Sequence, residues 1–172
     1  MNLPLLLLSP LAAGLLAAIV CDVRGRRIPN AISGLVFMSG VAVSAHVGGL
    51  AAAGSALAAS LILLLALYSP WRAGGLGGGD VKLAAATVAW VGLSKLVWFA
   101  LVVAVAGGVV AAVRYAFAPA SVRADVRANL VLAGLDGKLP PPEVASHRGK
   151  AKVSIPYAVA ISAGAAVALL IA

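Results

Sequence analysis

Long apolar stretches follow one another along the chain, with short polar breaks between them. A helix that crosses the roughly 30 Å hydrocarbon layer of a bilayer needs about 20 mostly apolar residues. Stretches of about that length recur here, and glycine, proline and charged residues mark the breaks. The pattern predicts an all-α, polytopic membrane protein, a bundle of about six transmembrane helices. These expected helices are residues 3–21, 31–47, 50–69, 81–93, 96–113 and 153–172.

The composition supports a membrane protein. Of the 172 residues, 63% are hydrophobic and only 10% are charged, and the mean hydropathy is +1.09. Soluble globular domains are roughly half apolar. Because about six spans and their loops use the whole length, we expect a single membrane-embedded domain over residues 1–172 and no separate soluble domain.

The charged residues predict the orientation of this bundle. They are concentrated in the breaks at 22–30, 70–80 and 114–152, and of the 13 lysines and arginines only Lys95 would lie on the other side. Since basic residues gather on the cytoplasmic side, these breaks are predicted to face the cytoplasm and both termini to face away from it. This bias accounts for the net charge of +8 without nucleic acid as a partner. The aromatic residues near helix ends, expected to be interfacial anchors, are Trp71, Trp90, Trp98, Tyr115 and Tyr157.

The fourth apolar stretch, residues 81–93, is too short to cross a bilayer, because it spans roughly 20 Å at 1.5 Å per residue. We expect this helix to begin earlier and to include residues 76–80. The glycines before Asp80 would then lie at the membrane boundary, where non-helical backbone must be covered by protein or water. The long break at 114–152 is expected to be a cytoplasmic loop, in which residues 121–133 form a short amphipathic helix on the membrane surface.

Several kinds of site are excluded by the residues available. The single cysteine, Cys21, excludes an intrachain disulfide framework and a zinc site built on cysteine pairs. His46 and His147 would lie on opposite sides of the membrane and could not share a metal ion. The glycine run at 74–79 lacks the Gly-Lys-Ser/Thr of a phosphate-binding loop. No metal ion or other cofactor is therefore expected.

Two carboxylates stand at the ends of expected helices. Asp22 follows the first apolar stretch and Asp80 precedes the fourth, and an ionisable residue at such a position is a functional candidate. The predicted topology puts both on the same side at similar depth, so packing could bring them together. Two neighbouring carboxylates share a proton: the ionised group can activate a water while the protonated group polarises a carbonyl. This is the chemistry of an aspartyl protease, and the pair titrates as a unit.

The same residues also have structural interpretations. Asp22 could be a loop carboxylate that balances Arg26 or Arg27, and Asp80 could cap a helix after the glycines. The glycines at 77–79 either let an extended substrate approach the backbone or form a flexible turn. For the whole chain, the alternatives are a small ion-coupled transporter or channel that uses both aspartates, and a noncatalytic assembly subunit.

Three segments together resemble a known family, the type IV prepilin peptidases, which are membrane aspartyl proteases of the GxGD type. Asp22 followed by residues 26–30 (Arg-Arg-Ile-Pro-Asn) resembles the first aspartate motif of that family. Residues 77–82 (Gly-Gly-Gly-Asp-Val-Lys) resemble the second, GxGD followed by Val-Lys. Residues 155–158 (Ile-Pro-Tyr-Ala) are similar to a Pro-Tyr/Phe-Gly signature, with alanine in place of the usual glycine. The resemblance covers residues 5–172.

The resemblance implies a membrane aspartyl endopeptidase that removes the short basic leader of a type IV prepilin or pseudopilin at the cytoplasmic membrane face. Asp22 and Asp80 would be the catalytic pair. Lys82, two positions after Asp80, falls on a different face of the helix and is expected to be an interface anchor rather than a direct partner of that carboxylate. The residues expected to contact the substrate are Gly77, Gly78, Gly79, Pro29, Asn30 and Lys82.

The chain also departs from part of the family. Larger bifunctional members carry a cytoplasmic segment with zinc-binding cysteine pairs and also N-methylate the mature pilin. This sequence shows no such segment and resembles the compact, peptidase-only form associated with tight-adherence (Flp) pili, so methyltransferase activity is not expected. The implied location is the bacterial cytoplasmic membrane, with membrane lipids and the precursor protein as partners.

Overall fold

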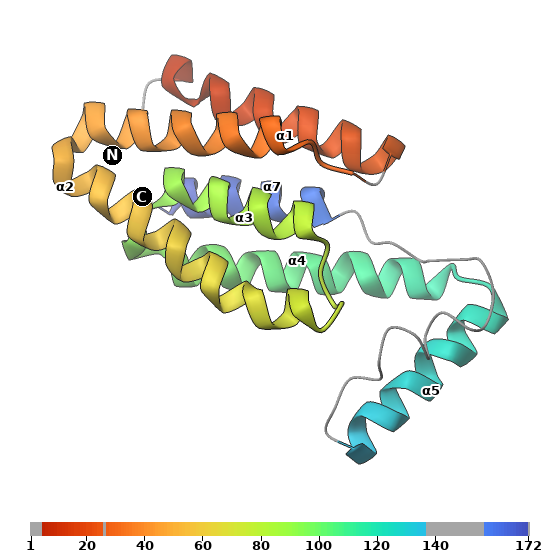
Figure 1. Ribbon diagram of the computed structural model, residues 1–172. Coiled ribbons are helices and arrows are strands. Elements are labelled where there is room, and N and C mark those ends of the chain that lie inside the picture. The colour runs from red at the N-terminus through yellow and green to blue at the C-terminus, as the bar shows by residue number, and fades with distance from the viewer. Residues whose placement is uncertain (1–4, 26, 137–156, 172) are drawn as a thin grey trace.

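The structure, a computed structural model, describes residues 5–25, 27–136 and 157–171. These residues form helices joined by short turns and contain no strand, which confirms the predicted all-α class. Arg26 and the polar segment at 137–156, which includes His147 and the Ile-Pro of the third motif, lie outside the described residues. The elements in order are α1 (Leu5–Gly25), α2 (Asn30–Arg72), α3 (Gly78–Val91), the 3-10 turn η1 (Leu93–Lys95), α4 (Leu96–Ala116), α5 (Ala120–Asp136) and α7 (Tyr157–Leu170) (Figure 1).

Helix α2 contains two of the expected membrane helices. Gly49, with φ 69° and ψ −165°, interrupts the helical backbone, and the chain turns back on itself at this point (Figure 1). A positive φ of this kind is accessible to glycine because it has no Cβ. The break falls where the sequence predicts a turn between the second and third helices. We refer to residues 30–48 and 50–72 as the first and second arms of α2.

The two arms and helices α1, α3, α4 and α7 run alternately in opposite directions (Figure 1). Helix α3 packs against α2 and α7, while α7 also contacts α1 and α4. Among the described helices, α1, α2 and the segment from η1 through α4 are long and apolar enough to cross a membrane. This arrangement is a helical bundle of the membrane type, as the hydropathy pattern predicts.

The shortest of the predicted spans, α3, is the most enclosed helix of the bundle. Every residue from Val81 to Val91 except Lys82 is buried. The expectation that this helix begins before residue 81 is confirmed, but it starts at Gly78 rather than at residue 76. Its 14 residues span about 21 Å. Neighbouring helices cover the helix from Val81 to Val91, whereas the non-helical backbone at its two ends is less enclosed: Gly77 is exposed and Gly92 is half-buried.

The contact between α3 and the first arm of α2 includes Trp90. Only 7% of its surface is exposed, and its indole Nε1–H donates a hydrogen bond to the carbonyl oxygen of Val36 over 2.8 Å. A Cβ atom at Gly40 would lie 2.6 Å from Trp90 Cδ1, so the glycine allows the two helices to approach. The prediction that Trp90 is an interfacial anchor is therefore wrong, since its polar N–H is satisfied inside the bundle.

The polar break after α4 begins later than expected, because α4 continues to Ala116. The short helix predicted at 121–133 is present as α5, which extends away from the rest of the bundle (Figure 1). Arg127 of α5 donates from Nε to the Tyr115 hydroxyl over 3.0 Å, which ties the two helices together near their junction.

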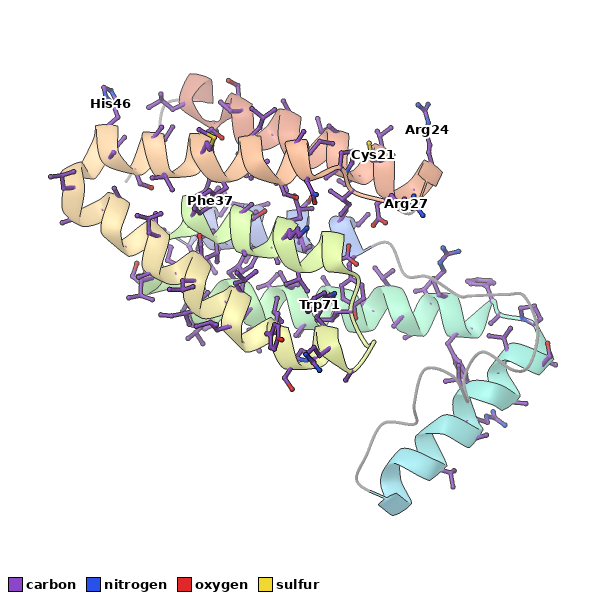
Figure 2. The ribbon with its side chains drawn as sticks, viewed as in Figure 1. Cys21, Arg24, Arg27, Phe37, His46 and Trp71 are labelled. Carbon is purple, nitrogen blue, oxygen red and sulfur yellow. The ribbon has the colours of Figure 1, made fainter. Side chains whose placement is uncertain are left out.

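The two ends of the bundle differ in charge. Arg24 and Arg27 lie at one end, and His46 lies at the other (Figure 2). The end that carries the arginines is also where α1 and α4 finish and where α3 and α7 begin (Figure 1). The chain thus gathers both aspartates and most of the described basic residues at one end, which we predict to be the cytoplasmic one.

Candidate active site

Asp22 lies in the last turn of α1 and contacts the beginning of α7. Its side chain is only 7% exposed, and its Oδ2 accepts a hydrogen bond from the backbone N–H of Ala158 over 3.2 Å. The first N–H groups of a helix have no partner within the helix, and this end carries a partial positive charge. The carboxylate of Asp22 therefore caps α7. Among the described residues it forms no ion pair with Arg27, one of the two partners expected for a charge-balancing loop carboxylate; the other, Arg26, lies outside those residues.

Asp80 lies in the first turn of α3, three residues after Gly77, the residue that precedes the helix. The carboxylate accepts a backbone hydrogen bond from Gly77 and lies close enough to Asp22 for a Coulombic interaction between the two side chains. A side chain at this position that reaches back to the start of its helix forms one half of a capping box. The structural interpretation of Asp80 as a cap is thus correct, and it also fixes the carboxylate next to Asp22.

A cavity of about 250 Å³ opens beside Asp80. The second arm of α2 and helices α3, α4 and α7 contribute to its wall. Asp80 and the Tyr157 side chain are its polar contributors, and the remaining lining is apolar. The lining residues are Leu63, Leu67, Leu76, Asp80, Val81, Ala84, Phe99, Ala100, Val103, Ala104, Tyr157 and Ile161. Tyr157 directly precedes Ala158, so the start of α7 touches both the Asp22 carboxylate and the cavity.

The three glycines before Asp80 have different packing roles. A Cβ at Gly77 would lie 2.5 Å from Oδ2 of Asp80, so a side chain there would displace the carboxylate. A Cβ at Gly79 would lie 3.2 Å from Cβ of Ile28, so this glycine lets the segment between α1 and α2 lie against the start of α3. A Cβ at Gly78 would lie 3.2 Å from the indole nitrogen of Trp71. The glycine motif therefore acts here as a site of close approach rather than only as a flexible turn.

The remaining predicted substrate contacts lie partly on another side of α3. Pro29 precedes α2 in an extended conformation, and its carbonyl accepts the N–H of Ile32 over 3.1 Å. Asn30 and Lys82 do come together, since Lys82 Nζ donates to Asn30 Oδ1 over 3.0 Å. Lys82 does not line the cavity beside Asp80. Its placement on a different face from Asp80 agrees with the helical spacing.

Tyr157 and Ala158 belong to the third sequence motif; the sequence predicts Tyr157 to be an interfacial anchor and gives Ala158 no role. The structure shows the physical basis of that motif: a backbone donor for Asp22 and an aromatic ring at the cavity. Because the donor is a backbone N–H, alanine in place of the usual glycine keeps this contact. The apolar cavity wall on α2 and α4 was not identified, because leucines and alanines there are typical of any membrane helix. No group of three or more histidine, cysteine or acidic side chains in the described part of the chain could hold a metal ion.

The sequence profile of the type IV leader peptidase family matches residues 10–112. This range includes both aspartates and ends before α7. The chain belongs to the type IV leader peptidase family. No curated protein and no solved structure gives a significant match to the chain. As a member of this family the protein is a membrane peptidase, and family membership implies a prepilin as the general class of its substrate.

Proposed function

We propose that this leader peptidase is an aspartyl endopeptidase in which Asp22 and Asp80 form the catalytic pair. One observation carries the proposal: two carboxylates from separate helices interact electrostatically, and one of them, Asp80, lines a cavity. Asp22 is fixed by the Ala158 N–H and Asp80 by the backbone of Gly77. Groups held in this way need little reorganisation before they act on a substrate.

The pair acts on a peptide bond with a bound water as the nucleophile. One carboxylate is ionised and takes a proton from the water as its oxygen attacks the carbonyl carbon, while the other carboxylic acid donates its proton to the carbonyl oxygen. The tetrahedral intermediate then breaks its C–N bond: the group that took the proton of the water donates it to the leaving nitrogen, and the group that is now ionised takes a proton from a hydroxyl of the intermediate. This step releases the free acid and the amine and restores the pair. Because the two groups share a proton, the roles of acid and base belong to the pair rather than to either residue.

The substrate enters through the apolar cavity next to Asp80. The cavity wall suits a hydrophobic segment, and Gly77, Gly78 and Gly79 present backbone that an extended chain can approach. Pro29 contributes from the neighbouring segment, which packs against Gly79 through Ile28. Asn30 and Lys82 remain predicted substrate contacts, although they lie away from this cavity.

The physiological substrate in this proposal is an Flp-type prepilin whose short basic leader is removed at the cytoplasmic face of the bacterial membrane. The clustering of Arg24 and Arg27 at the end of the bundle that holds the aspartates supports this orientation (Figure 2). Residues 1–172 act as one membrane-embedded peptidase domain, without methyltransferase activity and without a cofactor. The segment at 114–152, including α5, lies on the cytoplasmic side.

Cleavage of a co-expressed Flp-type prepilin tests the catalytic pair. Asp22→Asn and Asp80→Asn are each expected to lower the rate of leader removal by at least about 10²-fold, because each removes one group from the proton exchange. Asp125→Asn is the matched control, since it makes the same chemical change on α5. The amount of each variant in the membrane is measured in parallel.

Persistent cleavage by either Asp22→Asn or Asp80→Asn would remove that residue from catalysis. A wild-type protein that cleaves none of several prepilins would contradict the proposed substrate class. Aspartate-dependent proton or cation uptake into proteoliposomes, without cleavage, would identify the transporter alternative instead.

A further inference from the structure

A second concave surface lies on the other side of α3, away from the cavity beside Asp80. This open groove of about 590 Å³ runs between the two arms of α2 and is closed at its base by α3. Its residues are Asn30, Ser33, Gly34, Phe37, Leu57, Ser60, Leu61, Leu64, Lys82, Ala85 and Ala86. None of them lines the cavity beside Asp80. The groove is therefore a separate concave surface, although two of its residues, Asn30 and Lys82, are also predicted substrate contacts.

One end of the groove is polar, and the rest is apolar except for Ser60, whose hydroxyl donates to the Ala56 carbonyl. Asn30, Ser33 and Lys82 lie in the first turns of α2 and α3, at the end of the bundle that carries the arginines. Leu57 and Leu61 lie farther along, and about half of each side chain is exposed. Leu61 precedes Arg72 by 11 residues and thus lies about 16 Å along the helix from that end, near the middle of a bilayer.

The Ser33 hydroxyl is the unusual group in this groove. Only 6% of Ser33 is exposed, and its Oγ has no hydrogen-bond partner among the described residues. Ser60, Thr87 and Ser162 each donate to the carbonyl four residues earlier. A buried hydroxyl without a partner is costly. Because Ser33 is one of the residues that line the groove, a ligand bound there is a candidate partner for this hydroxyl.

Lys82 supplies a positive charge at the same end. Its Nζ donates to Asn30 Oδ1, and it forms no ion pair within the described part of the chain. Its remaining donors are available to an anion, and Ser33, which lines the same groove, offers another. A ligand that fits must carry a negative head at the membrane boundary and an apolar chain toward the bilayer centre.

We propose that this groove binds an anionic phospholipid, with its phosphate at Lys82, Asn30 and Ser33 and one acyl chain along Phe37 and Leu61. The charge of Lys82 complements the phosphate, and the lipid can enter from the bilayer because the groove is open along α2. Each basic residue at a membrane boundary contributes about 1 kcal/mol to the binding of an anionic lipid, which corresponds to a roughly fivefold higher affinity for that lipid.

Native mass spectrometry of the full-length protein in detergent tests the proposal. The probes are palmitoyl-oleoyl-phosphatidylglycerol and the diacylglycerol with the same two chains, which lacks the phosphate. Wild type is expected to bind the phospholipid about fivefold more tightly than the diacylglycerol, and Lys82→Gln should abolish this preference. Lys95→Gln, in η1 beyond the opposite end of α3, is the charge-matched control and should keep it.

Two further variants test the site within the groove. Ser33→Ala should weaken phospholipid binding by roughly fivefold without lowering thermal stability, because the hydroxyl makes no bond that the protein would lose. Gly34→Leu should weaken binding of both lipids, since a Cβ at Gly34 meets no atom within 4 Å and the added side chain would occupy the groove. Gly54→Leu is the matched control, because its Cβ position is equally open and it does not line the groove.

Phospholipid binding that is the same in wild type, Lys82→Gln and Gly34→Leu would overturn the proposal. A second outcome would also overturn the proposal: lipid binding is unchanged in Lys82→Gln and Gly34→Leu, but both variants raise the KM for prepilin and Gly54→Leu does not. In that case the occupant of the groove would be the substrate.

Discussion

The carboxylate of Asp22 accepts the backbone N–H of Ala158 over 3.2 Å, across 136 positions of the chain. This bond links the end of the first helix to the start of the last one. It also explains why a proline-aromatic-small motif at the last helix accompanies the two aspartate motifs. The motif places a helix N-terminus where it can hold one carboxylate and an aromatic ring where it can line the cavity beside the other.

Two substitutions of Asp22 should separate its structural role from its proposed catalytic role. Asp22→Asn keeps an oxygen that can accept the Ala158 N–H, so its thermal stability should stay close to that of wild type. Asp22→Ala leaves that donor without a partner and should lower the free energy of unfolding by about 1 kcal/mol. Both variants should fail to cleave prepilin. Thermal unfolding of the purified variants in detergent measures the loss of stability, and the cleavage assay measures the loss of activity. Equal thermal stability of Asp22→Ala and wild type would contradict the capping role of Asp22.

Gly77→Ala should impair cleavage far more than it impairs stability. The added Cβ would lie 2.5 Å from Oδ2 of Asp80, and the carboxylate can move away because it is the end of a flexible side chain. A catalytic group displaced by about 1 Å costs on the order of 10²-fold in rate. Gly75→Ala, whose Cβ would lie 3.4 Å from the Pro70 carbonyl oxygen, is the control in the same loop. Cleavage kinetics that are equal for Gly77→Ala and Gly75→Ala would show that the position of this carboxylate is not critical.

Gly40→Ala should destabilise the bundle. Its Cβ would lie 2.6 Å from Cδ1 and 2.8 Å from Nε1 of Trp90, a buried ring that has little room to move. Overpacking of this kind costs about 1–3 kcal/mol. Gly54→Ala, in the same helix but with open space around its Cβ, should leave the melting temperature unchanged or slightly raised. A melting temperature for Gly40→Ala equal to that of Gly54→Ala would mean that α2 and α3 do not pack as described.

Filling the cavity beside Asp80 should reduce substrate turnover. Ala104 of α4 lines the cavity, and Ala104→Leu adds apolar volume at its wall. We expect kcat/KM for prepilin to fall about tenfold, because a small change in the volume of a hydrophobic pocket alters kcat/KM for its substrate by about this factor. Ala112→Leu makes the same change on α4 outside the cavity and should have no effect. Unaltered kinetics in both variants would indicate that the substrate does not enter this cavity.

Local features of the sequence carried most of the fold prediction. The helices, the break near Gly49 and the early start of α3 were predictable because hydrophobic length and glycine position act over a few residues. The different faces of Asp80 and Lys82 also followed from helical spacing. Trp90 was misjudged because its position near a helix end is typical of an interfacial anchor, and only its partner on another helix shows otherwise.

The sequence by itself determined that the chain is a bundle of apolar helices with two aspartate motifs at one end, since hydropathy and short motifs are properties of neighbouring residues. Only the tertiary structure decided that Asp22 caps α7, that Gly77 and Gly79 serve different neighbours, and that the cavity and the groove lie on separate sides of α3. These relations join segments far apart in the chain. They depend on which side chains fit together when the helices pack, and periodicity alone does not specify that fit.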